Sequence, residues 1–179
     1  MLTLGECFKD IKQIDETSIA KLSGQLWKLG TVQQIKEKVS HELFILHIGI
    51  NVIGIWKSDG WWSIISEYAE LVPFIPDTLK AFGLLDLKAA FEKIISYFPE
   101  NTVYINDENY CDTVNFLQNT WFKVSSEKLN AISLEKRKEM VKSVHRYLEE
   151  LEQMTEPLWG YSGESNGWKN VLDYISACQ

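Results

Sequence analysis

The sequence predicts an all-α protein: a single-domain, multi-helix bundle around one buried central helix. Apolar residues recur at helical spacing along most of the 179 residues. Proline occurs only four times, at places where a helix could begin or end. The best β-like run, Val103-Tyr104-Ile105, is only three residues long. With 45% hydrophobic and 24% charged residues, the chain has a globular composition, and its length suits one domain.

Capping signals open the first two predicted helices. Thr3 and Glu6 have the spacing of a capping box, and an apolar run follows them. Asp15 or Thr17 is placed to cap the second helix, and Gly30 is placed to close it.

The next segment predicts the centre of the bundle. Thr31 opens a helix over residues 31–57, which is apolar all round from Leu43 onward. A helix that is hydrophobic on every side is buried, so we predict this one as the central helix. Ser58-Asp59-Gly60 would end it as a turn, and residues 1–30 would pack on a 31–179 core.

Four further helices are predicted between residues 61 and 122. Prolines and polar caps set most of their ends. We predict a helix over 61–72 that Pro73 ends, a short one from Pro76 to near Gly83, one that Asp86 caps and Pro99 stops, and one over 107–122 with Trp121 on its apolar side.

Ser133 caps the clearest amphipathic helix, Leu134–Met154, in which apolar residues recur at seven-residue spacing. Its basic residues crowd the first half and its acidic residues the second, which opposes the helix dipole. Two explanations stand: pairing with neighbouring elements, or contact of the basic turns with an acidic partner. A loop over 157–167 and a last helix, Trp168–Ala177, complete the prediction.

The charge of the chain bears on its partners. The net charge is −7, whereas nucleic-acid binders usually carry a basic face, so direct nucleic-acid binding is disfavoured. Residues 61–130 carry five lysines and ten acidic residues. We therefore expect a protein partner with a basic surface, because complementary charge speeds encounter and fixes register.

Neither a membrane nor an oxidising compartment is indicated. The longest apolar run, Leu43–Trp56, has 14 residues, whereas a bilayer span needs about 20. The N-terminus lacks the pattern of a signal peptide. The three cysteines are far apart in the sequence and form no disulfide or zinc pattern. We predict a cytoplasmic protein.

Known catalytic motifs fail on spacing. His41 and His47 are six residues apart, whereas a zinc-binding helix needs two histidines four apart. The segment Ser162-Gly163-Glu164-Ser165 lacks the strand–turn–helix context of a nucleophile elbow. Gly49 and Gly54 lie in a helical pattern, which indicates close helix packing rather than a phosphate cradle. We predict no enzyme activity, and no catalytic, cofactor-binding or metal-binding residue.

Trp61-Trp62 is the most unusual local feature. Adjacent helical positions point about 100° apart, so both rings are buried only if two neighbours cover them. Either the pair belongs to the core, or one ring is an exposed recognition anchor, since tryptophan is enriched at binding hot spots. Trp159 and Tyr161, in the predicted late loop, are similar candidates.

Several segments resemble the bacterial DNA-mimic protein family. The resemblance covers roughly residues 40–179 and rests on these segments: Leu79-Lys80-Ala81-Phe82-Gly83-Leu84, Ala89-Ala90, Phe98-Pro99, Leu151-Glu152-Gln153-Met154, Trp159 and Val171-Leu172-Asp173-Tyr174-Ile175. The Asn-Gly-Gly-Phe-like turn of the family is altered here to Asn51-Val52-Ile53-Gly54 and Ser58-Asp59-Gly60-Trp61-Trp62. The resemblance implies an all-helical domain that presents acidic side chains to a DNA-binding protein.

Three functional hypotheses remain. The first is a non-enzymatic protein-binding domain, either an acidic regulator of a basic partner or an immunity protein that neutralises a toxin, with these contact residues: Asp107, Glu108, Asp112, Trp61 and Trp62. The second is an enzyme with a dispersed active site around His41, His47 or His145. The third is a homo-oligomer formed through the apolar stripe of residues 134–154.

Overall fold

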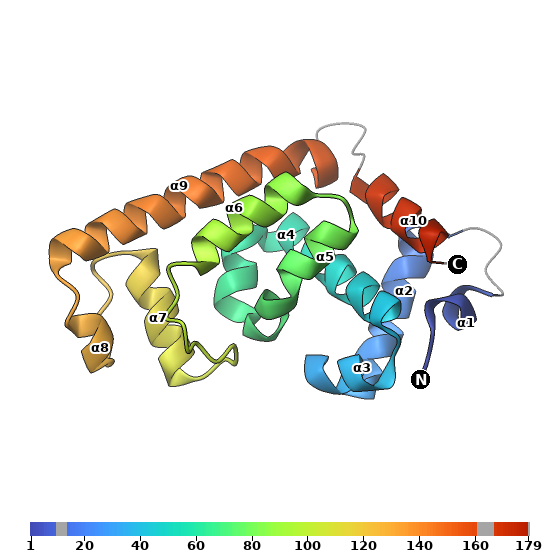
Figure 1. The fold of residues 1–179 in the computed structure, drawn as a ribbon, viewed down its shortest axis with the longest axis horizontal. Coiled ribbons are helices and arrows are strands. Elements are labelled where there is room, and N and C mark those ends of the chain that lie inside the picture. The colour runs from blue at the N-terminus through green and yellow to red at the C-terminus, as the bar shows by residue number, and fades with distance from the viewer. Residues whose placement is uncertain (10–13, 161–166, 179) are drawn as a thin grey trace.

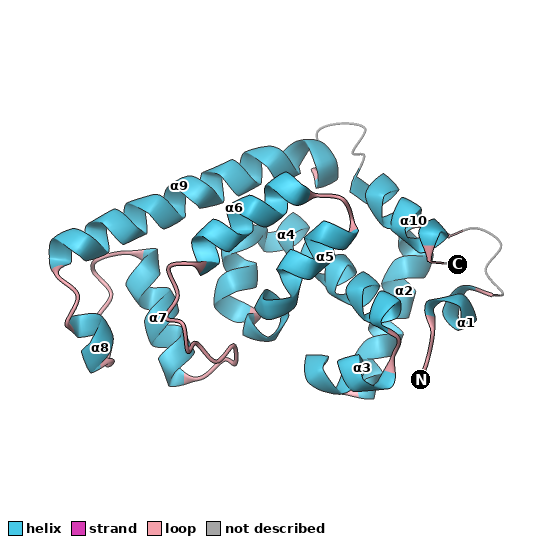
Figure 2. Ribbon diagram, in the orientation of Figure 1, coloured by secondary structure: helices cyan, strands magenta, loops and turns pink. Residues whose placement is uncertain are grey.

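The computed structural model describes residues 1–9, 14–160 and 167–178, and it confirms the all-α prediction. Helices pack together as one body, and the described residues form no strand (Figure 2). The helices are α1 (Leu4–Phe8), α2 (Glu16–Leu26), α3 (Val32–Lys38), α4 (His41–Glu67), α5 (Ile75–Ala81), α6 (Leu85–Ile95), α7 (Glu108–Gln118), α8 (Glu127–Asn130), α9 (Leu134–Trp159) and α10 (Gly167–Ala177), with short 3-10 helices at Trp27–Leu29 and Ala69–Phe74.

Helix α4 runs through the middle of the molecule, where it packs against α2, α5, α7, α9 and α10. The long helix α9 lies beside α6 along one edge (Figure 1). Helices α1, α2, α3 and α10 gather with both termini at one end, and α7 and α8 lie at the other. None of the helices that the structure describes combines the length and hydropathy needed to cross a bilayer.

The two predicted N-terminal caps are confirmed. The Thr3 hydroxyl accepts a hydrogen bond from the backbone N–H of Glu6, whose carboxylate accepts one from the N–H of Thr3. Asp15 accepts from the N–H of Ser18 in the same way at the start of α2. Each pair satisfies backbone donors that a helix end otherwise leaves unpaired.

The predicted central helix over 31–57 is wrong in its first part, because the helix is interrupted between the end of α3 at Lys38 and the start of α4 at His41. The N–H of Leu2 donates to the Lys38 carbonyl at 3.1 Å, and the N–H of Ser40 donates to the Leu2 carbonyl at 2.8 Å. The Ser40 hydroxyl then caps α4. Over residues 43–50 the predicted burial on all sides is confirmed, since every residue there is buried, whereas several residues over 51–57 are half-buried or exposed.

Gly60 divides α4 into two helical parts. Its φ of 78° and ψ of 178° are not helical, and residues with a Cβ avoid this combination. The turn predicted at Ser58-Asp59-Gly60 is therefore a one-residue break, and the chain continues as helix to Glu67.

Two glycines of α4 differ from each other in their surroundings. A Cβ on Gly49 would lie 2.3 Å from the Phe82 ring, so the predicted close packing is confirmed there. At Gly54 nothing lies within 4 Å of such a Cβ, so the same prediction is wrong.

Three further predictions, on α6, α7 and α9, are corrected. Helix α9 continues past Pro157, so Trp159 is a buried helix residue at 1% exposure rather than a loop residue. Helix α7 ends at Gln118, which leaves the predicted core residue Trp121 88% exposed. Asp86 lies in the first turn of α6, and Leu84 occupies the cap position.

The seven-residue stripe of α9 is largely used inside the protein. Val144 and Leu151 are fully buried, and Leu148 packs against the core. Helix α9 makes these contacts with α6, α7 and α4. Only Leu134, at the start of the stripe, is more than half exposed.

Candidate functional site

Two of the three acidic residues predicted to meet a partner hold the fold together. Asp107 caps α7 by accepting a hydrogen bond from the N–H of Tyr110 at 2.8 Å. One oxygen of the buried Asp112 accepts from the N–H groups of Ser125 and Ser126, both at 2.7 Å. Glu108 alone of the three is exposed and makes no such contact.

The tryptophan pair lies mainly in the core. Trp61 is fully buried, and its indole N–H donates to the hydroxyl of Thr155 at 2.9 Å. Its ring packs against those of Phe91 and Trp159. Trp62 is half-buried against the core. This placement leaves Trp61 no surface to offer a partner, and Tyr161 lies outside the described residues.

The three histidines lie apart from one another. His41 is exposed at the start of α4, and His145 on α9 lies 2.7 Å from the Gln118 carbonyl. His47 is fully buried, and burial lowers its pKa to about 4. Over residues 1–9, 14–160 and 167–178, no three His, Cys, Asp or Glu side chains could hold a metal ion together.

His47 belongs to a small buried polar network between α2 and α4. Its Nδ1 lies 3.2 Å from the Ser23 hydroxyl, which also accepts a hydrogen bond from the Asn51 amide. The indole N–H of Trp27 donates to the Asn51 carbonyl oxygen at 2.9 Å. The Nε2 of His47 has no partner. A serine beside a histidine can act as a nucleophile, but both residues of this pair are buried, and neither lines any of the three cavities described for this protein.

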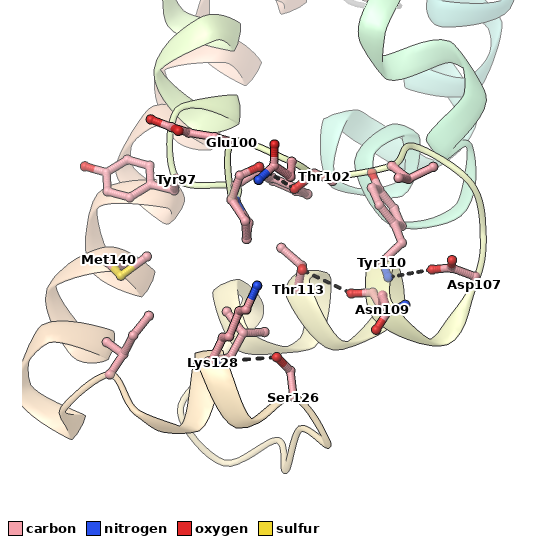
Figure 3. A pocket seen from close by; sticks show the side chains of 16 residues that line it. Tyr97, Glu100, Thr102, Asp107, Asn109, Tyr110, Thr113, Ser126, Lys128 and Met140 are labelled. Atoms are coloured by element: carbon pink, nitrogen blue, oxygen red, sulfur yellow. Dashed lines mark hydrogen bonds between the residues drawn. The ribbon is translucent and has the colours of Figure 1, made fainter.

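A cavity lies between the α6–α7 loop, α7, α8 and α9, with a volume of about 590 Å³ (Figure 3). Its walls combine apolar side chains, such as Phe98, Leu129 and Met140, with hydroxyl groups and one lysine, Lys128. No histidine or cysteine lines it.

A second, shallower groove lies along one face of α9 and has a volume of about 560 Å³. Four of its seven lining residues are basic or can become so: Lys138, Lys142, His145 and Arg146. Thr120 closes its other side, and Trp121 follows Thr120 directly. Trp121 and the 42% exposed Phe122 are large aromatic side chains that follow this groove residue in the chain. We call this surface, residues 120–122 with the α9 groove, the α9 face.

Arg137 fixes the loop that carries Trp121. Its guanidinium donates to the carbonyls of Phe116, Asn119 and Phe122 at 2.7–3.0 Å, where α7 ends. The Asn119 side chain in turn accepts from the N–H of Trp121. A cation at a helix C-terminus also complements the helix dipole. Trp121 is therefore exposed on a backbone that these hydrogen bonds hold in place.

Sequence reasoning missed the α9 face because it extended α7 to Phe122. The helix period then placed Trp121 with Val114 and Leu117, which are buried. The unusual charge order of the 134–154 helix was the one signal that pointed to this surface.

We compared the chain with protein-family models, curated proteins and solved structures, and found no match in any of the three. The resemblance to the DNA-mimic proteins therefore stays a prediction.

Proposed function

We propose that this chain is a non-enzymatic protein-binding domain whose α9 face binds a partner with an acidic surface. The observation that carries the proposal is Trp121, a tryptophan at 88% exposure on a backbone held by hydrogen bonds. An indole ring left in water contributes little burial free energy to the fold. Tryptophan and arginine are enriched at binding hot spots, where such a ring is buried by the partner.

Charge supports an acidic partner. Lys138 and Lys142 form no ion pair with a described residue, whereas Arg146 pairs with Glu150 at 3.8 Å. The groove therefore has more basic than acidic side chains, with Glu149 as its one acidic lining residue, and this favours carboxylates over a basic surface. The net charge of −7 disfavours nucleic acid as the anionic partner.

The earlier hypothesis, an acidic surface that meets a basic partner, has less support. Asp107 and Asp112 use carboxylate oxygens within the fold, and Trp61 is buried. A basic partner would have to rely on Glu108 and its exposed neighbours.

The test is a pull-down that uses four forms of the full chain as bait: wild type, W121A, K138E/K142E and the charge-reversed control E108K. The proposal expects one partner that wild type and E108K retain and that W121A and K138E/K142E lose. Its affinity should fall as salt rises, because exposed charges are screened. Loss on E108K alone would favour the basic partner instead, and binding that nuclease treatment abolishes would show a nucleic acid.

A further inference from the structure

The cavity of Figure 3 has the size of a small-molecule site. At about 590 Å³ it falls within the roughly 300–1,000 Å³ range of ligand pockets. It lies on the side of α7 and α8 that faces the α6–α7 loop, and it shares no lining residue with the α9 groove. A ligand here would be distinct from the partner of the α9 face.

The walls offer apolar contact. Phe98, Tyr110 and Leu129 are buried core residues that also line the cavity, and Ile132 and Met140 are half-buried beside them. The Tyr110 hydroxyl donates to the Ile65 carbonyl, so this tyrosine presents its ring rather than a free hydroxyl. An apolar ligand body would remove this surface from water, which favours binding.

One charge points into the cavity. Figure 3 shows the Lys128 ammonium directed toward Thr113, and the lysine forms no ion pair with a described residue. The two acidic lining residues are placed differently. The Glu100 carboxylate points away from Lys128, and Asp107 lies beyond Tyr110, where it caps α7.

Hydroxyl groups also line the cavity. Ser126 accepts a hydrogen bond from the N–H of Leu129, so its own hydrogen is free to donate. The Thr113 hydroxyl donates to the Asn109 carbonyl and retains a lone pair. An ammonium and a hydroxyl donor in the walls of one cavity are suited to a carboxylate, because charge-assisted hydrogen bonds are the stronger kind.

We propose that this cavity binds a small amphipathic monocarboxylate, with its carboxylate on Lys128 and its apolar body against Phe98, Leu129 and Met140.

Calorimetric titration with sodium octanoate tests the proposal, with octylammonium and butyrate as the matched ligands. Octanoate should bind, octylammonium should not bind because Lys128 repels it, and butyrate should bind at least tenfold more weakly because it lacks most of the apolar body. Equal binding of octanoate and octylammonium, or no octanoate binding at millimolar concentration, would overturn the proposal.

Variants locate the site. K128Q should raise the Kd for octanoate roughly tenfold, since a charge-assisted bond is lost, whereas the control K123Q, outside the cavity lining, should leave it unchanged. M140W should fill the cavity and abolish binding, with its thermal unfolding measured to confirm that it folds. W121A should leave octanoate binding intact, which separates this proposal from that of the α9 face. Wild-type affinity in both K128Q and M140W would place octanoate elsewhere and refute the assignment.

Discussion

The carboxylate of Glu152 on α9 accepts a hydrogen bond from the backbone N–H of Trp61 at 2.9 Å. The same carboxylate accepts from the indole N–H of Trp56 at 2.6 Å. Because Gly60 interrupts α4, Trp61 opens a second helical part whose first N–H groups lack partners within the helix. Glu152 thus caps a helix from 91 residues away in the sequence and joins both parts of α4 to α9.

Replacing Glu152 with alanine should lower the free energy of unfolding by about 2–3 kcal/mol, because two donors lose a charged acceptor. Urea denaturation measures this loss. The control E149A removes the same charge from an exposed position of α9 and should change stability by less than about 0.5 kcal/mol. Equal effects of the two substitutions would show that Glu152 contributes only its charge.

The break at Gly60 predicts a pair of glycine effects with opposite signs. G60A should destabilise the fold by about 1–3 kcal/mol, since its φ of 78° strains any residue with a Cβ. G54A, in the same helix with open space around its Cβ, should stabilise it by roughly 0.5–1 kcal/mol. Thermal unfolding compares both with wild type. A stabilising G60A would mean that the helix is not broken at this residue.

The burial of His47 predicts a loss of stability in acid. The fold lowers the pKa of this imidazole to about 4, from its ordinary value near 6.5, because burial disfavours the charged form. The folded state therefore keeps its full stability above pH 6.5, where His47 is neutral in both the folded and the unfolded chain. Stability is lost as the pH falls toward 4, because only the unfolded chain then binds a proton at this residue. The loss should reach about 3 kcal/mol.

Urea denaturation between pH 7 and 4 should show this slope in wild type and in the exposed control H41Q. H47Q should lack it. Glu6, Asp15 and Glu42, whose hydrogen bonds lower their carboxyl pKa, act alike in wild type and H47Q and cancel in the comparison of these two forms. A slope that survives in H47Q would assign the pH dependence to other groups.

Arg137 should not tolerate a conservative change. R137K keeps the charge but loses the planar fork that reaches three carbonyls, so we expect a loss of about 1 kcal/mol, and R137Q should lose about 2 kcal/mol. The exposed neighbour K138Q should change stability by less than about 0.5 kcal/mol. Chemical denaturation gives all three values. If R137K were as stable as wild type, the planar guanidinium and its bonds to three carbonyls would not be what stabilises the end of α7.

The features that could be predicted from the sequence are those set by residues close together in the chain. The caps at Thr3, Asp15 and Ser133 follow from side chains three residues from their backbone partners, so the sequence contains both halves of each interaction. The burial of residues 43–50 was predictable for a similar reason, because a helix that is apolar on all sides has only one stable place.

The helix ends and the site that the sequence did not predict depend on contacts between residues far apart in the chain. The break between α3 and α4 depends on hydrogen bonds to Leu2, and the end of α7 is held by Arg137 from α9. Neither interaction leaves a periodic signature in the chain. Pro157 indicated a helix end by the usual rule, yet α9 runs two residues further and buries Trp159. The candidate site was missed for the same reason, since Trp121 is placed by a residue 16 positions away.

Helix α9 has 26 residues and so extends about 39 Å. Arg137 near its beginning and Glu152 near its end hold two other helices by hydrogen bonds of opposite polarity. Detaching α9 would therefore release α7 and the second part of α4 in the same step. Amide protons of these three helices should accordingly exchange with solvent as one cooperative unit, with a shared opening free energy.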